Sequence, residues 1–232
     1  MAVIALMMTV SASAQFYIYC SDGNVIKVDS ISMVAPKESV HEYVDLGLSV
    51  KWATCNVGAT KPEEYGDYFA WGEIAPKEEY SWSTYTYCNG SSSSLTKYNY
   101  NSSLGFVDNK TQLELSDDAA RANWGGKWRM PTDAELTELR EQCTWTWTTQ
   151  NGVYGYKVTS KKSGYTNNSI FLPAAGNRGV SSLMSDGKLG HYWSSTPDFS
   201  YDNSYSIRFT SGARNMCSDG RNGGKSIRPV ME

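Results

Sequence analysis

The stretch NWGGKWRMPTDAEL, residues 123–136, combines a glycine pair, a proline and the start of a helix. Thr132 and Glu135 have the T-x-x-E spacing of a capping box, in which each of the two side chains bonds a free backbone N–H at the start of a helix. Apolar residues then follow at i, i+3 and i+7. This pattern predicts a helix over 133–142 whose buried face is formed by Leu136, Leu139 and Cys143.

We interpret this stretch as scaffold and not as a site. The pair Gly125-Gly126 is expected to allow a close approach of the backbone. Trp124, Trp128 and Leu136 are expected to anchor the helix to a sheet. Arg129 is expected to be a partly buried residue near the helix start, in an ion pair or bonded to the backbone.

A second helix is predicted just upstream, in the segment SDDAARANW. Ser116 is expected to cap this helix, because serine accepts hydrogen bonds from free N–H groups at a helix start. Asp117 and Asp118 then lie in the first turn, where the helix dipole favours negative charge.

Short strands surround these helices. The segment 143–160, CTWTWTTQNGVYGYKVTS, alternates apolar and polar residues and contains Asn151-Gly152, a pair typical of a type I′ hairpin turn. Residues 44–52 also alternate with period two, with a possible turn near Gly47. Two helices among many short, mainly antiparallel strands indicate an α+β fold. Further strands are predicted at 169–174, 191–196, 205–210 and 226–230.

The first 41 residues form a separate region. Residues 1–14, MAVIALMMTVSASA, have the apolar run and small-residue ending of a secretory signal peptide cleaved after Ala14. No Lys or Arg precedes the apolar run, so we expect the true start to lie upstream of Met1. Within residues 15–41, residues 15–34 are interpreted as a small hairpin and 35–41 as its linker, and residues 42–232 are interpreted as the main domain. The expected location is therefore secreted or cell-surface.

Composition argues against two classes of partner. The 232 residues carry a formal net charge of −3, and their Lys and Arg residues are scattered. Nucleic-acid binding is therefore not expected. The N-terminal apolar run is too short to span a bilayer, so membrane insertion is not expected either.

The five cysteines have no metal-ligand spacing, which argues against structural zinc. An odd number in a secreted chain leaves at least one cysteine unpaired or bonded to another chain. We expect mostly buried thiols with at most one or two disulfides, and the sequence leaves the pairing open. The residues concerned are Cys20, Cys55, Cys88, Cys143 and Cys217.

Several of these motifs together resemble a known family. WGGKWRMPTDAELTEL, IFLPAAG, YWSST and the terminal SIRPV, with the segments that begin at YVDLGLSVKW and CTWTWTTQNG, resemble the FISUMP (Fibrobacter succinogenes major paralogous) domain, which is related to the DUF1566 family. The resemblance covers about 42–230. It implies a secreted or surface protein. Many members of the family occur in Bacteroidota, and the family has no settled biochemical function.

A more distant similarity joins the G-x-W-R-M-P-T-x-A-E run to the sulfatase-modifying (formylglycine-generating) enzyme family, and the chain's ending to C-type-lectin-like folds. This similarity implies a C-type-lectin-like domain with its two ends paired in one sheet and long loops over one face. It supports a fold more than a function.

Enzymatic chemistry is not expected, and no catalytic residue is predicted. The sulfatase-modifying family uses a cysteine pair near the C-terminal end of its domain, whereas Cys217 here stands alone. The two histidines are His41, in the linker, and His191, which we interpret as structural. The chain has no G-x-S-x-G, P-loop or H-E-x-x-H motif.

No cofactor or metal is predicted, although calcium stays open. Asp198, Asp202, Asn203, Asp219 and Asn222 supply oxygen ligands on expected loops. Their spacing matches no EF-hand, and the E-P-N and W-N-D motifs of calcium-dependent C-type lectins are absent. Asp and Asn are also ordinary turn formers.

Binding of an extracellular glycan or protein is the expected function. Three expected loops, around 177–178, 199–205 and 214–222, combine Tyr, Arg, Asn, Ser and Gly, which is typical of adaptable recognition loops. Trp145, Trp147 and Trp193 are instead expected in the core. Three alternatives remain: a structural or assembly module of a surface protein, a diversified target-binding protein, and an enzyme of the sulfatase-modifying type. The candidate binding residues are Asn177, Arg178, Tyr201, Asn203, Arg214, Asn215, Asp219, Arg221 and Asn222.

Overall fold

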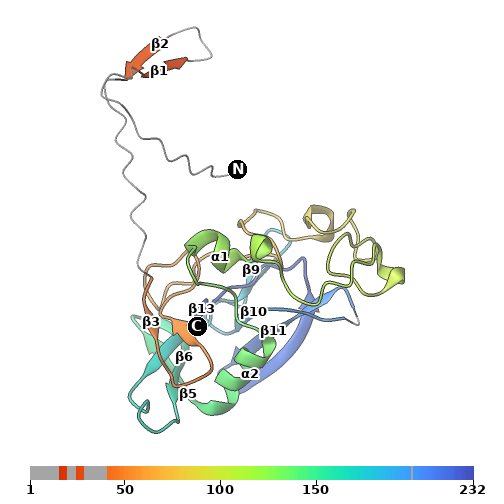
Figure 1. Cartoon of the computed structure of the whole chain (residues 1–232). Helices are drawn as coiled ribbons and strands as arrows, with labels where there is room; N and C mark the ends of the chain where they lie inside the picture. Colours follow the sequence, from red (N-terminus) through yellow and green to blue (C-terminus); the bar gives the residue numbers. More distant parts are fainter. Residues whose placement is uncertain (1–15, 20–24, 29–40, 200) are drawn as a thin grey trace. The chain divides into compact units, whose positions relative to one another are not determined.

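The computed structural model describes residues 16–19, 25–28, 41–199 and 201–232 (Figure 1). The chain divides into two units, Met1–Ser39 and Val40–Glu232. In the first unit, β1 (Phe16–Tyr19) pairs with β2 (Val25–Val28) in an antiparallel hairpin, which confirms the predicted hairpin. The expected signal peptide, residues 35–40 of the expected linker and Cys20 lie outside the described residues.

The second unit is an α+β fold rich in short antiparallel strands. Its described residues form three three-stranded sheets, with orders β5-β6-β7, β10-β11-β12 and β13-β4-β3, and one two-stranded sheet, β8-β9. The elements, in chain order, are β3 (Tyr43–Val44), β4 (Lys51–Ala53), α1 (Ala119–Trp124), α2 (Asp133–Gln142), β5 (Cys143–Gln150), β6 (Val153–Ser160), β7 (Ser169–Pro173), β8 (Asn177–Gly179), β9 (Ser182–Met184), β10 (Gly190–Pro197), β11 (Asn203–Thr210), β12 (Ala213–Gly220) and β13 (Val230–Met231).

Helix α2 begins and ends where the sequence predicts. The Thr132 hydroxyl accepts a hydrogen bond from the Glu135 N–H at 3.2 Å, and the Glu135 carboxylate accepts one from the Thr132 N–H at 2.8 Å. Leu136 and Leu139 are buried, and the helix packs across β10, β11 and β12 (Figure 1). The capping box therefore sets the start of the helix that covers this sheet.

The hairpin of β5 and β6 is also confirmed. Asn151 and Gly152 have φ of +47° and +83°, as a type I′ turn requires, and Gln150 pairs with Val153 across it. Trp145 is buried and Trp147 packs partly buried against the same core, while Trp193 is fully buried in a second cluster. These three tryptophans are core residues, as expected.

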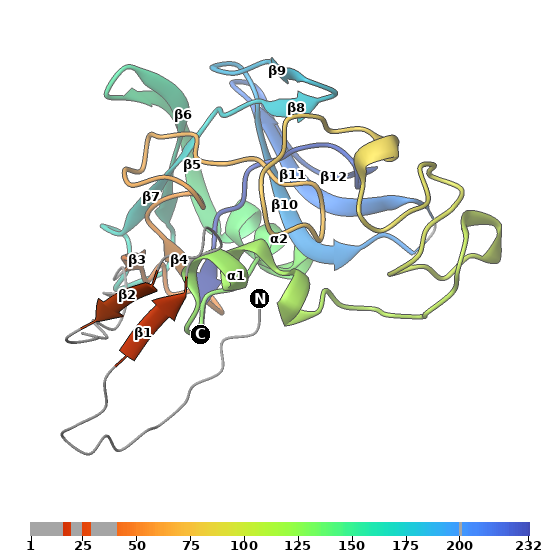
Figure 2. The same cartoon turned by 90° about the horizontal axis from the view of Figure 1, so that it is seen from above.

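The expected strand over 44–52 is broken. Gly47 has φ of +67°, so the chain turns between β3 and β4, and Val44 pairs back with Trp52. Trp52 also pairs with Val230 of β13, which joins the two ends of the domain in one sheet (Figure 2). The strand predicted over 226–230 is wrong in extent: residues 226–229 lie outside β13, with Ser226 in an isolated bridge and Pro229 accepting a bond from Ala53.

Three local expectations are wrong. Asp118, and not Ser116, caps α1, because Leu115–Asp117 forms a separate 3-10 turn. An added Cβ would meet nothing within 4 Å at Gly125 or Gly126, so the glycine pair does not serve a close approach of the backbone. Glycine is favoured at both positions because their φ angles are positive, +69° and +56°. Trp124 lies on α1, where it stacks on His41 with ring centroids 3.7 Å apart and does not anchor α2.

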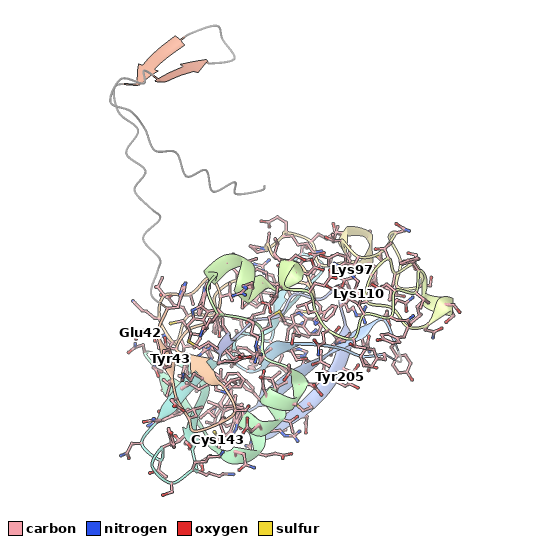
Figure 3. The ribbon with its side chains drawn as sticks, in the orientation of Figure 1. Glu42, Tyr43, Lys97, Lys110, Cys143 and Tyr205 are labelled. Atoms are coloured by element: carbon pink, nitrogen blue, oxygen red, sulfur yellow. The ribbon has the colours of Figure 1, made fainter. Side chains whose placement is uncertain are left out.

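A long irregular segment connects β4 to α1 and is held by ion pairs and buried aromatic rings. Lys97 contacts Asp117 and Glu114, both at 2.5 Å, and Lys110 also pairs with Glu114. Lys97 and Lys110 both lie in this segment (Figure 3). Tyr98 donates a hydrogen bond to Asp117 at 2.6 Å. This segment supplies most of the walls of the cavity described below.

Candidate functional site

The nine predicted binding residues do not form one site. They were expected on loops, but six lie in strands: Asn177 and Arg178 in β8, Asn203 in β11, and Arg214, Asn215 and Asp219 in β12. Strand β12 was missed because its sequence, ARNMCSDG, is polar on both faces and gives no apolar alternation. Tyr201, in a bend, is 62% exposed, and Arg221 and Asn222 lie in a turn.

Arg221 is a structural residue. It is 1% exposed, and its guanidinium donates hydrogen bonds to the carbonyls of Asn203 and Tyr98, both at 2.9 Å. The guanidinium carbon lies 4.9 Å from the Trp71 ring centroid. Arg221 therefore fixes the start of β11 to the irregular segment and is not placed to contact a ligand.

Asp219 belongs to a buried polar cluster with His191 and Ser206. His191 Nε2 lies 3.0 Å from Asp219 Oδ2 and 3.1 Å from Ser206 Oγ, and the serine hydroxyl donates to the same carboxylate oxygen at 2.6 Å. Burial lowers the pKa of His191 to about 4, so the imidazole is neutral at pH 7. The serine proton points to the carboxylate and not to the imidazole, which is not the arrangement of a nucleophile with its base.

Lys225 is the cation next to this cluster. Its Nζ lies 3.5 Å from the Trp193 ring centroid, and the residue is 4% exposed. Burial lowers the pKa of Lys225 to about 7, although the nearby charge of Asp219 opposes the shift. Burial disfavours ionisation of Asp219, but the hydrogen bond from His191 and the charge of Lys225 together lower its pKa well below the ordinary value. These groups stabilise one another inside the fold.

A cavity of about 440 Å³ lies beside β8. One side is formed by Arg178, and the remainder comes from the irregular segment between β4 and α1. Two buried tyrosine rings contribute the aromatic part, and four charged side chains contribute the polar part. The lining residues are Gly66, Asp67, Tyr68, Pro76, Lys77, Glu78, Tyr80 and Arg178.

The walls of this β8 cavity are fixed by hydrogen bonds. Arg178 exchanges two backbone bonds with Gly224, at 2.7 and 2.8 Å, and Tyr80 exchanges two with Val180, at 2.7 and 3.0 Å. The Tyr80 hydroxyl donates to the Tyr68 carbonyl at 2.6 Å. The cavity is therefore preformed, and its tyrosine rings are held in place before any ligand arrives.

Three of the four charged side chains that line the β8 cavity have no ionic partner among the described residues. Lys77 pairs with Glu73 at 2.9 Å. Over the part of the chain that the structure describes, the side chains of Asp67, Glu78 and Arg178 make no ion pair or hydrogen bond, and the Arg178 guanidinium lies 5.6 Å from the Tyr68 ring centroid. Charged groups left available around a preformed cavity are typical of a binding site for a polar ligand. Sequence reasoning identified Arg178 but missed the other two, whose only signal was the aromatic-rich segment 65–100.

Two of the five calcium candidates, Asp198 and Asp219, are engaged in other contacts. Asp219 bonds His191 and Ser206, and Asp198 accepts a hydrogen bond from the Ser218 hydroxyl at 2.5 Å. Within residues 41–199 and 201–232, no group of three or more His, Cys, Asp or Glu side chains is placed to hold a metal ion.

The four described cysteines are free thiols: Cys55, Cys88 and Cys143 are buried, and Cys217 is partly exposed. No helix among the described residues is long and apolar enough to cross a membrane. Comparison of the chain with protein-family models, with curated proteins and with solved structures found no match.

Proposed function

We propose that this chain is a secreted or cell-surface binding protein without enzymatic activity, and that its ligand is an extracellular glycan bound in the β8 cavity. The observation that carries the proposal is the set of available charges, Asp67, Glu78 and Arg178, around a preformed aromatic cavity. Carboxylates accept hydrogen bonds from sugar hydroxyls, and the guanidinium donates to sugar oxygens. The lining residues include no His, Cys or Ser. We assign the two carboxylates, Asp67 and Glu78, to binding and not to the acid–base chemistry of glycoside hydrolysis, and an assay for cleavage of the bound glycan checks this assignment.

The size of the cavity favours a ligand of one or two sugar rings. Ligand pockets of about 300–1,000 Å³ hold small molecules, and the volume of about 440 Å³ lies in this range. Tyr68 is 7% and Tyr80 1% exposed, so these rings close the apolar side of the cavity, and the charged side chains are expected to hold the sugar. A FISUMP-type, C-type-lectin-like identity of the domain is part of the same proposal, supported by the pairing of β13 with β4 and by the long segment between β4 and α1.

A protein partner is the second candidate function, favoured by the β8-β9 hairpin next to the cavity. Val180, Leu183 and Met184 are 60%, 36% and 42% exposed. Apolar side chains on a short exposed hairpin are typical of protein-binding surfaces and fit the alternative of an assembly module.

A glycan array followed by calorimetric titration of the best ligand tests the proposal. We expect Arg178→Gln to weaken binding by about tenfold or more, since hydrogen bonds to charged groups contribute about 1.5–3 kcal/mol. The matched control is Arg214→Gln, which removes an exposed arginine that does not line the cavity. Equal affinities of the two variants would place the ligand elsewhere, and stable self-association without any glycan ligand would favour the assembly module.

A further inference from the structure

A second cavity, of about 290 Å³, lies beside α1 and residues 127–129. Arg121 lies in the last turn of α1, and Gly125 and Gly126 then reverse the chain, so that residues 127–129 also face the cavity. The lining residues are Leu115, Arg121, Lys127, Trp128, Arg129 and Glu232. Three of these six side chains are cationic.

Two of the three cations are available to a ligand. Arg129 is paired with Glu135, at 2.7 Å. The side chains of Arg121 and Lys127 make no ion pair or hydrogen bond with any residue that the structure describes, while the backbone of Arg121 is fixed by bonds to Asp118 and Gly125. The position of Arg121 is thus set by the helix, and its charge remains uncompensated.

One carboxylate competes for this cavity. Glu232 is 81% exposed at its side chain, and its Oε1 lies 3.9 Å from Arg129 Nη2. The backbone bonds between Arg129 and Val230, at 3.0 and 2.9 Å, hold the end of β13 against this cavity. An anion bound here would displace the Glu232 carboxylate, whose contact with Arg129 is long and exposed.

We propose that this cationic cavity binds an acidic sugar through a single carboxylate or sulfate group held by Arg121 and Lys127. Arginine and lysine side chains form charge-assisted hydrogen bonds with oxyanions. Leu115, which is 54% exposed, supplies apolar surface beside them for the sugar ring. The proposal concerns a different cavity from the β8 cavity and holds whether or not that cavity binds a glycan.

The cavity does not suit a long polyanion. Nucleic-acid binding by charge requires several phosphate contacts along an extended basic surface. Here two available cations line a cavity of about 290 Å³, on a chain whose formal net charge is −3. One anionic group on a small ligand matches this charge.

Calorimetric titration of the full chain with a galactose trimer that carries one terminal galacturonic acid tests the proposal, with the trimer methyl-esterified at that carboxylate as the neutral match. We expect the acidic trimer to bind at least about tenfold more tightly than the ester, and the double variant Arg121→Gln, Lys127→Gln to lose this difference. The control Lys157→Gln, Lys188→Gln removes two exposed lysines outside the cavity and is expected to bind as the unmodified chain does.

Glu232→Gln supplies a gain-of-binding test that unfolding cannot imitate. Removal of the competing carboxylate is expected to raise the affinity for the acidic trimer by about threefold, by analogy with the weak coupling of exposed charges. A trimer with one sulfate in place of the carboxylate distinguishes the two anions: tighter binding of the sulfated trimer would support a sulfate ligand, and tighter binding of the carboxylated trimer a carboxylate. Equal binding of acid and ester, or unchanged binding in the double variant, would overturn the proposal.

Discussion

The two terminal nitrogens of Arg129 reach the two carboxylate oxygens of Glu135, at 2.8 Å for Nη1–Oε2 and 2.7 Å for Nη2–Oε1. The same carboxylate closes the capping box with Thr132, and Arg129 also exchanges backbone bonds with Val230. One ion pair therefore connects the start of α2 to the end of the chain.

Arg129→Ala is expected to lower the free energy of unfolding by about 2–4 kcal/mol, because it leaves the carboxylate of Glu135 largely buried without its partner. Urea denaturation measures the change. Arg140→Ala is the control. Arg140 pairs with Glu141, which is 56% exposed, so this substitution is expected to lower the free energy of unfolding by less than about 1 kcal/mol. Equal losses in the two variants would contradict this account of the pair.

Gly224→Ala is expected to destabilise the fold by about 1–3 kcal/mol, because an added Cβ would lie 2.6 Å from the Tyr80 ring. Gly223→Ala is the matched control, since its Cβ would approach nothing closer than 3.5 Å. Thermal melting of both variants checks the difference. If Gly224→Ala melts like Gly223→Ala, the Tyr80 ring is not held as tightly as its hydrogen bonds indicate.

Lys225→Met is expected to remove a pH dependence of stability. Burial lowers the pKa of Lys225 to about 7 in the folded chain, while an unfolded lysine titrates near 10.5. Between these values the unfolded chain binds a proton that the folded chain does not, so the free energy of unfolding of the unmodified chain rises with pH.

The expected rise from pH 7.5 to 9.5 is about 2–3 kcal/mol, from 1.4 kcal/mol for each of the nearly two pH units over which the proton difference persists. Chemical denaturation of both proteins at the two pH values measures it, and the methionine variant should show little of the rise. Lys157→Met, at an exposed position, is the control and should keep it. If the free energy of unfolding changed with pH in the same way with and without Lys225, the lowered pKa of Lys225 would be contradicted.

Thiol labelling is expected to separate Cys217 from the other described cysteines. Cys217 is partly exposed, whereas Cys55, Cys88 and Cys143 are buried. Burial raises the pKa of Cys217, so a maleimide should modify it more slowly than a free cysteine but before the other three. Peptide mapping by mass spectrometry identifies the modified residue. Early labelling of Cys143 would contradict the packing of β5.

Structural features that depend only on neighbouring residues are predicted well from the sequence. The capping box of Thr132 and Glu135 and the turn at Asn151-Gly152 lie where the sequence predicts, because both depend on hydrogen bonds or φ values within a few residues. The start of α1 was misplaced because Ser116, Asp117 and Asp118 are all good caps, and tertiary contacts decide among them. In the structure Asp118 also accepts a bond from the Met130 N–H.

Most of the candidate site could not be predicted from the sequence, because its residues lie far apart in the chain. Arg178 was identified by its type, but Asp67 and Glu78 meet it through the pairing of Tyr80 with Val180 and of Arg178 with Gly224. Arg221 and Asp219 have residue types common in binding sites, yet burial makes them structural. Side-chain polarity alone does not distinguish these two outcomes.

The most direct test of the central claim is a crystal structure of the protein with the best ligand from the glycan array. We expect a sugar in the β8 cavity, with oxygens within hydrogen-bonding distance of Arg178 and of Asp67 or Glu78. A ligand bound instead on Tyr201 or on Arg214, with the β8 cavity empty, would contradict it.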